Sequence, residues 1–161
     1  MAGEEVKKAR AQKIEIASPM AGKVVKLADV PDEVFASAAL GEGVAILPTD
    51  GKVYAPCDAV VTTLMDSGHA IGLLSDDGAE LLIHVGLDTV NMNGAPFKYN
   101  VKANQQVKKG DLLLTADLAA IEKAGYKTHT PVIVTNTEDF ASVTATNVPN
   151  VKVGDKILTI A

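Results

Sequence analysis

Two histidines near the middle of the chain are the residues whose types and spacing could do chemistry. His84 lies between the aliphatic residues Ile83 and Val85. Burial among aliphatic side chains disfavours the imidazolium, so it lowers the pKa of a histidine and favours the neutral, nucleophilic ring. A lone histidine in an apolar strand is more often a packed core residue. A second histidine just upstream, His69, favours a chemical role for the pair.

The segments that carry the two histidines are predicted to form a β-hairpin, because Asp77-Gly78 between them is a strong hairpin turn signal. A two-residue turn there would pair Ile71 with His84. A slip of two residues would pair His69 with His84 directly. Both registers place both imidazoles on one face, with Cβ atoms about 5–8 Å apart. Two rings at that distance could share one small oxyanion.

Composition limits the class of protein. With 161 residues, 47% of them hydrophobic and 22% charged, the chain is expected to form one globular domain with a proper core. A net charge of −5 and the lack of a basic run argue against nucleic-acid binding. Cys57 is the only cysteine, so an internal disulfide is impossible and a reducing compartment is expected. The sequence shows no signal peptide and no apolar run of about 18 residues, which predicts a cytoplasmic protein without membrane insertion.

The elements that must position the histidines are predicted to be mostly strands. Residues 1–12 are charged and aperiodic and are interpreted as a flexible tail or linker end, and residues 13–161 as the folded domain. Helical periodicity is confined to the short segments 32–40, 117–124 and 138–143. Besides the hairpin, short β-favouring runs bounded by Gly, Pro, Asp and Asn occupy residues 13–17, 22–27, 43–46, 51–55, 59–65, 112–117, 130–135 and 156–160.

Two internal echoes indicate a duplicated β-sandwich. The run 18–27 is similar to 55–64, with a proline followed by a small residue, valine and leucine at matching places. The run 107–115 is similar to 151–159, and in both a Gly-Asp turn leads into an apolar strand. The predicted fold class is therefore all-β, with internal duplication and a few short helical turns.

The residues around His84 resemble a known motif. The run 78–90 has a glycine, an acidic residue, three aliphatics, the histidine, an aliphatic, a glycine, an aliphatic, and then Asp, Thr and Val. It resembles the phosphorylation-site motif of the glucose-family IIA domain of the bacterial phosphoenolpyruvate-dependent sugar phosphotransferase system. The similarity extends to the segments 29–36, 40–46, 68–70, 97–98 and 107–111, and so spans nearly all of residues 13–161.

The resemblance implies a flattened antiparallel β-sandwich or barrel with a shallow active face and a phosphotransferase activity. His84 matches the phosphorylated residue of the family, and His69 matches its second active-site histidine. The small phosphocarrier protein HPr would donate the phosphoryl group, and a cysteine of a IIB domain of a sugar permease would receive it. No cofactor is required for this relay. The resemblance also implies that His69 and His84 can bind zinc when a partner adds a carboxylate, and that regulatory targets such as transporters are possible.

Several further residues are candidates for supporting roles. Ser67 could orient His69, and the carbonyl of Gly86 could hold the second nitrogen of His84. Thr89 is expected either to hydrogen-bond near the site or to satisfy a strand end. Asp32 and Asp88 are predicted to form an acidic rim that steers a basic partner.

An apolar ring around the histidines is predicted to dock the partners, with core packing as the alternative for each member. His129 has no match in the motif and is interpreted as a surface residue. The docking candidates are Val34, Phe35, Leu40, Met65, Leu82, Val90 and Met92.

The sequence leaves three alternatives to the relay. A zinc-dependent hydrolase using His69 and His84 would need a third protein ligand, and neither His-x-His nor His-Glu-x-x-His occurs. A lipoyl- or biotin-type carrier would need a lysine in a characteristic hairpin setting, which is absent. A non-catalytic regulatory binding module stays open, as do the sugar, the oligomeric state and whether the chain is free-standing or part of a larger permease.

Overall fold

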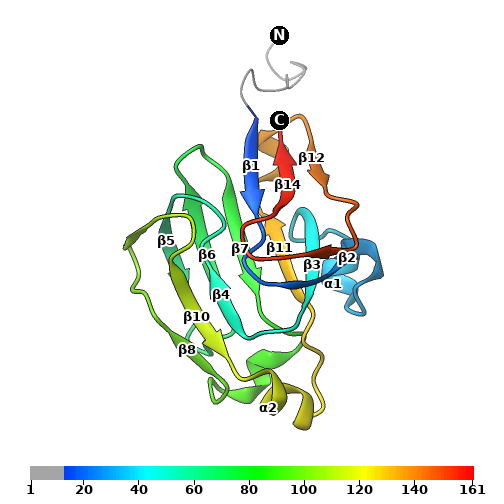
Figure 1. Ribbon diagram of the computed structural model, residues 1–161, viewed down its shortest axis with the longest axis vertical. Coiled ribbons are helices and arrows are strands. Elements are labelled where there is room, and N and C mark those ends of the chain that lie inside the picture. Colours follow the sequence, from blue (N-terminus) through cyan, green and yellow to red (C-terminus); the bar gives the residue numbers. More distant parts are fainter. Residues whose placement is uncertain (1–12) are drawn as a thin grey trace.

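The computed structural model describes residues 13–161 as antiparallel strands with a few short helices (Figure 1). The tail expected over residues 1–12 lies outside the described residues. The helices are α1 (Glu33–Ala36) and α2 (Leu118–Lys123), with 3-10 turns at Leu27–Asp29, Thr89–Met92 and Thr137–Asp139. The strands are β1 (Ile14–Ala17), β2 (Gly22–Lys26), β3 (Glu42–Pro48), β4 (Lys52–Tyr54), β5 (Ala59–Leu64), β6 (Ala70–Ser75), β7 (Glu80–His84), β8 (Phe97–Tyr99), β9 (Gln106–Val107), β10 (Leu112–Ala116), β11 (Thr130–Val134), β12 (Val143–Ala145), β13 (Asn150–Val151) and β14 (Lys156–Ile160).

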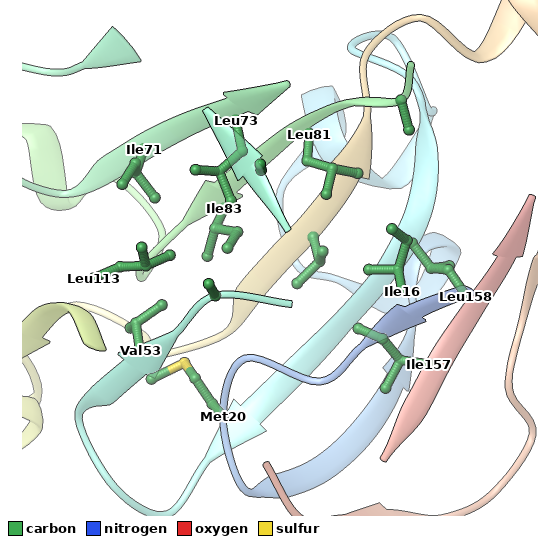
Figure 2. Close-up of a cluster of buried hydrophobic side chains, with 14 of the residues drawn as sticks. Ile16, Met20, Val53, Ile71, Leu73, Leu81, Ile83, Leu113, Ile157 and Leu158 are labelled. Atoms are coloured by element: carbon green, nitrogen blue, oxygen red, sulfur yellow. The ribbon is translucent and has the colours of Figure 1, made fainter. Parts of the chain in front are cut away.

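The strands form one large sheet and two small ones. The large sheet has the order β13-β2-β3-β11-β7-β6-β5-β9, and the small sheets have the orders β1-β14-β12 and β4-β10-β8. Buried side chains from all three sheets share one core, including Ile83 from β7, Leu113 from β10 and Leu158 from β14 (Figure 2). The two small sheets therefore pack on the inner face of the large one, which confirms the predicted all-β antiparallel sandwich.

Strand β7 alternates between the core and the opposite face of the sheet. Leu81 and Ile83 point into the core and are 2% and 0% exposed (Figure 2). Leu82 and His84 are half-buried on the outer face. The period of two in a strand dictates this separation. Burial of Leu81 and Ile83 in the core therefore also orients His84 toward the outer face.

The predicted hairpin register is wrong by one residue. Ser75 and Ala79 close a three-residue loop, and the third loop residue, Gly78, has a φ of +99°. A three-residue loop that ends in a left-handed glycine shifts the pairing relative to a two-residue turn. Ala70 therefore lies opposite His84. Ile71 lies opposite Ile83 in the core, not on the face of His84 as predicted.

Other differences involve short elements. The helix predicted over 138–143 is absent: this segment holds part of a 3-10 turn and the start of β12. The helix predicted over 32–40 is only α1 and its flanking turns. Strands β8, β9, β12 and β13 were not predicted, because two or three residues are too few to show an alternating pattern.

The predicted duplication is present in the backbone hydrogen bonds. The amide of Ala17 donates to the carbonyl of Pro56 (3.0 Å), and the amide of Tyr54 donates to the carbonyl of Pro19 (2.9 Å), so the two proline bends cross reciprocally. The two Gly-Asp turns are also equivalent. In each, the Asp carboxylate accepts from the amide of the lysine three residues earlier, at 2.9 and 2.8 Å.

The duplication makes the large sheet nearly symmetric about the pair β11 and β7. Gly22 of β2 pairs with Val151 of β13, and Ala59 of β5 pairs with Val107 of β9, at matching places of the two echoes. The order β13-β2-β3-β11 then corresponds to β9-β5-β6-β7. The strand pairings can be followed in each half from the outer strands to the middle of the sheet. Ile133 of β11 then has the same position in the first half as His84 of β7 has in the second half.

The outer face of the sheet is covered over β3 and β11. Residues 27–41, which connect β2 to β3, include α1 and form a second apolar cluster against the sheet. In Figure 1 this connection lies beside β2 and β3. The equivalent connection between β5 and β6 is only residues 65–69, so most of the outer face beyond β7 is left without such a cover. The members of the cluster are Leu27, Val30, Phe35, Ala45, Leu87 and Ile133.

Candidate active site

His84 ends β7 on the outer face, and its ring is fixed by the loop that follows. Nδ1 of His84 lies 2.8 Å from the carbonyl oxygen of Gly86. A carbonyl can only accept, so this contact places the proton of the neutral ring on Nδ1 and leaves a lone pair on Nε2. Gly86 has a φ of +83°, and a Cβ there would clash with Thr89. A glycine is therefore needed to bring this carbonyl under the imidazole. The contact predicted between Gly86 and His84 is present.

The loop after His84 is tied to the core and to a neighbouring segment. The buried hydroxyl of Thr89 donates to the carbonyl of Val85 (2.6 Å), so Thr89 satisfies the end of the strand, the second of its two expected roles. The amide of Gly86 donates to the carbonyl of His129 (3.0 Å). His129, interpreted as a surface residue, is half-buried, and its backbone supports this loop.

His69 meets His84 from the turn between β5 and β6. His69 is only 5% exposed, and its ring lies edge-on to the ring of His84, with the centroids 4.6 Å apart. The left-handed Gly68, with a φ of +76°, redirects the chain, and the carbonyl of His69 accepts from the amide of Val85 (2.7 Å). Ala70 lies opposite His84, so in a regular strand His69 would project from the other face of the sheet. The irregular turn is what brings the two rings together.

Ser67, predicted to orient His69, does not do so through the buried Nδ1 of the ring. Nδ1 of His69 is buried and has no hydrogen-bond partner among residues 13–161, so the Ser67 hydroxyl does not hold it. Ser67 itself is half-buried in the same turn. His69 is oriented instead by its backbone and by the ring of Phe97, whose centroid lies 6.5 Å from that of the imidazole.

Burial lowers the pKa of both imidazoles and so favours their neutral forms. Burial, and then the nearby charge of His84, lowers the pKa of His69 to about 4. Burial also lowers the pKa of His84, although the contact to Gly86 and the carboxylates of Asp32 and Asp88 oppose this shift. The neutral form of His84 is the nucleophilic one. The site therefore combines a nucleophilic nitrogen with a second neutral imidazole that can donate a hydrogen bond.

The predicted docking residues fall into two groups. Val34, Leu40, Met65 and Val90 are between 40% and 49% exposed, whereas Leu82 and Met92 are half-buried. The prediction that Phe35 docks a partner is wrong, because Phe35 is only 5% exposed and offers a partner almost no surface. The alternative of core packing applies to this residue. Its ring packs against His84 at a centroid distance of 5.0 Å and so forms a wall of the site.

The two predicted rim carboxylates lie at the edges of the site. Asp32 is the N-cap of α1, and its side chain accepts from the amide of Val34 at 3.0 Å. Asp88 is exposed and adopts a left-handed conformation with a φ of +61°. Asp32 therefore shapes the helix that presents Phe35 and Val34, while Asp88 leaves the negative end of its side chain free to meet a partner.

A hollow of about 300 Å³ lies on the outer face beside the site. It includes Met65, Leu82, Leu74 and Gly72, and Leu82 is the residue two before His84 on the same face. Sequence reasoning missed Gly72 and Leu74. A glycine within an alternating strand was the available signal, because such a residue often marks a site where another molecule approaches closely.

The described residues offer few ligands for a metal. Residues 13–161 hold no group of three His, Cys, Asp or Glu side chains arranged to bind a metal ion. His69 and His84 provide two nitrogens, fewer than the three protein ligands of a catalytic zinc site. Residues 13–161 therefore do not complete a hydrolytic zinc site by themselves, and the zinc-hydrolase alternative is not favoured. Nor does any helix among residues 13–161 have the length and apolar character needed to cross a membrane.

Comparison with known proteins identifies the class of this fold and site. Residues 14–140 match the family model described as phosphoenolpyruvate-dependent sugar phosphotransferase system, EIIA 1. The glucose permease IIA of Mycoplasma capricolum has a similar structure, with a TM-score of 0.83 and 33% identity, covering 92% of this chain and 96% of that one. The glucose-specific EIIA component of Oceanobacillus iheyensis is 38% identical over 151 residues, covering 94% of this chain and 92% of that protein.

Other relatives are much longer than this chain. The beta-glucoside-specific EIIBCA component of Halalkalibacterium halodurans is 46% identical over 147 residues, which is 91% of this chain but 23% of that protein. The chain spans about a fifth of the length of such multidomain relatives. The chain belongs to the EIIA 1 family, the phosphoryl-transfer components of the sugar phosphotransferase system.

Proposed function

We propose that His84 is the residue that carries the phosphoryl group, accepting it from phospho-HPr and passing it to a cysteine of a IIB domain for sugar uptake. The observation that carries this proposal is the contact from Nδ1 of His84 to the carbonyl of Gly86. It fixes the tautomer, directs the lone pair of Nε2 outward, and holds the ring on a face where a partner can approach.

The transfer is an in-line displacement at phosphorus. The lone pair of Nε2 forms the new nitrogen–phosphorus bond, while the bond from phosphorus to the donor breaks and its electron pair stays with the donor. In the second step the sulfur of the acceptor cysteine attacks phosphorus, and the electron pair returns to Nε2. The imidazole therefore needs to be neutral before each acceptance, which is the state that its lowered pKa favours.

His69 is proposed to stabilise the phosphoryl oxygens during transfer. Its unpartnered, buried Nδ1 is better left as an unprotonated acceptor than as an unsatisfied donor, so the ring proton belongs on Nε2. From there a hydrogen bond to a phosphoryl oxygen strengthens as negative charge accumulates on it. The apolar rings and aliphatic side chains around the pair, including Phe35, keep out water that would hydrolyse the phosphorylated histidine.

The partners are proposed to dock on the outer face around His84. The exposed side chains of Val34, Leu40, Met65 and Val90 belong to the segments that adjoin the two histidines, and the hollow beside Leu82 extends along β6 and β7. Asp32 and Asp88 give its rim a negative charge that attracts a basic partner. A cytoplasmic location belongs to the same proposal, since Cys57 has no second cysteine to pair with.

Zinc binding, and the binding of regulatory targets such as transporters, are secondary parts of the proposal. His69 and His84 together could supply two ligands to a zinc ion, and a partner carboxylate would have to supply a third. Such a shared site would require the partner to bind over the same face. The relay itself needs no cofactor in this proposal, because both histidines act as neutral imidazoles.

The proposal is tested by incubating the chain with phosphoenolpyruvate, the upstream kinase and HPr. Wild type and a His129→Gln control are expected to acquire acid-labile phosphate, and His84→Ala is expected to acquire none. Labelling of His84→Ala at the wild-type level would contradict the assignment. His69→Gln is expected to accept phosphate but to pass it on slowly, because His69 matters more in the transition state than in the ground state. Transfer by His69→Gln at the wild-type rate would refute its proposed role.

A further inference from the structure

The hydroxyl of Tyr99 lies at the base of the turn that carries His69. Its oxygen is 2.8 Å from the carbonyl oxygen of Met65 and 2.7 Å from that of Ala70. Met65 and Ala70 are the two residues that close this turn, and the amide of Met65 also donates to the carbonyl of Ala70 (3.2 Å). The Tyr99 hydroxyl therefore donates to the carbonyls at both ends of the turn. These hydrogen bonds connect the turn to strand β8, which belongs to a different sheet.

A second side chain of β8 supports the same turn. Phe97 and Tyr99 are two residues apart, so they project from the same side of the strand. The ring of Phe97 lies 6.5 Å from that of His69, and a Cβ at Gly68 would approach the Cβ of Phe97 to 2.8 Å. Strand β8 thus contacts the turn twice, with an apolar contact at its tip and a hydrogen-bonding contact at its base.

The turn has few other restraints on the position of the His69 ring. Nδ1 of that ring has no hydrogen-bond partner among residues 13–161, and the left-handed Gly68 beside it is a flexible residue. The backbone of the turn is held by the amides of Met65 and Gly68, which donate to the carbonyls of Ala70 and Met65, and by the amide of Val85, which donates to the carbonyl of His69. The contacts from β8 are the side-chain restraints on the same turn. The side chains that contact this turn from another sheet are therefore those of β8.

We propose that Tyr99 is a positioning residue for phosphoryl transfer, holding the turn 65–70 so that His69 meets the ring of His84. This inference rests on the proposed role of the two histidines. Burial raises the pKa of the Tyr99 phenol, so the hydroxyl keeps its proton at neutral pH and remains a donor to the two carbonyls.

Tyr99→Phe tests the proposal, because it removes the hydroxyl and keeps the ring. Tyr54→Phe is the matched control, since Tyr54 lies on β4 at the opposite edge of the same small sheet. Tyr99→Phe is expected to lower the maximal rate constant for transfer from phospho-HPr about tenfold and to change the half-saturating concentration less than about twofold, because the displacement of His69 affects the transfer step and Met65 is only one of several docking side chains. The control is expected to transfer at the wild-type rate. A wild-type rate in Tyr99→Phe, or a loss of the same size in the control, would overturn the inference.

The same substitution in a His69→Gln background separates positioning from general damage. If Tyr99 acts through His69, the second loss is expected to be less than about twofold, whereas an unrelated defect would multiply in full. Equal fold-losses in both backgrounds would overturn the inference while leaving the proposed function intact.

A measurement without phosphoryl transfer keeps the two proposals distinguishable. Titration of His69 by NMR is expected to show a pKa closer to the ordinary value in Tyr99→Phe than in wild type, because a loosened turn exposes the ring. An unchanged pKa of His69 would contradict the inference. Absence of phosphate on wild-type His84 would instead refute the proposed function.

Discussion

The two halves of the large sheet share one backbone plan but differ in what lies over their outer faces. In the first half, residues 27–41 fold over the sheet, and Ile133 beneath them is 0% exposed. In the second half, the corresponding connection is residues 65–69, and His84 at the equivalent position is half-buried. The longer connection buries Ile133 as a core residue. The shorter connection leaves His84 accessible to a partner.

The cover of the first half also serves the site in the second. Phe35 of α1 belongs to the apolar cluster over β3 and β11, and its ring contacts His84. The short turn of the second half contributes His69 on the other side. A duplicated scaffold thus produces a single site at the boundary between its halves, because only one half is covered.

The largest expected effect concerns stability in the covered half. Ile133→Ala should lower the free energy of unfolding by about 3 kcal/mol, because it leaves a cavity beneath α1. Leu74→Ala in the open half should cost less than about 1 kcal/mol, since that side chain is 40% exposed. Urea denaturation measures both. Equal losses would mean that the open half is covered in solution.

A pH-dependent effect should belong to the open half. The pKa of His69 falls from 6.5 to about 4 on folding, so the unfolded state binds more protons between these values and stability falls as the pH is lowered through that window. Between pH 7 and 4.5, the free energy of unfolding should therefore fall by about 2 kcal/mol less in His69→Gln than in wild type. Denaturation curves at pH 7 and 4.5 measure it. Ile133→Val is the control, expected to lower stability equally at both pH values; an unchanged pH dependence in His69→Gln would contradict the shifted pKa.

A docking effect should be smaller. Met65→Ser is expected to raise the half-saturating concentration of phospho-HPr about fivefold, or about 1 kcal/mol, with little change in the maximal rate, because it removes exposed apolar contact. Val153→Ser is matched in exposure, at 41% against 40%, and lies in the turn between β13 and β14. Transfer kinetics with both variants provide the measurement. A similar increase with Val153→Ser would argue against a localised docking surface.

The smallest expected effect concerns the rim charges. Asp32→Asn and Asp88→Asn should each lower the second-order rate constant about twofold at low salt and hardly at all at high salt, because exposed charges act mainly on encounter. Asparagine preserves the N-cap at position 32 and tolerates the left-handed backbone at position 88. Rates measured across a salt series test this, and a loss that persists at high salt would point to a direct structural role.

Sequence patterns could predict most of what positions His84. Alternation along 80–84 places Leu81 and Ile83 in the core and His84 outside, and local turn chemistry at the two Gly-Asp sites preserves the signature of duplication. The contact between Gly86 and His84 is also local, spanning two residues. These features depend on neighbours in the chain, which is why the amino-acid sequence indicates them directly.

The features that escaped prediction depend on tertiary context. The hairpin register depends on whether Gly78 ends a two- or a three-residue loop, and both are compatible with Asp-Gly. Phe35 has the character of a docking residue until Leu82, Leu87 and Ile133 are seen packed around it. Tyr99 acts through two carbonyls about thirty residues away in sequence, with no local pattern to reveal the contact.

The most direct test of the account is to locate the phosphoryl group on the isolated phosphorylated chain. Phosphorus–nitrogen NMR of protein labelled in its histidine rings distinguishes the two nitrogens of each imidazole. The contact of Nδ1 with Gly86 predicts phosphate on Nε2 of His84 and on no nitrogen of His69 or His129. Phosphate on Nδ1 of His84, or on either of the other histidines, would contradict the central claim.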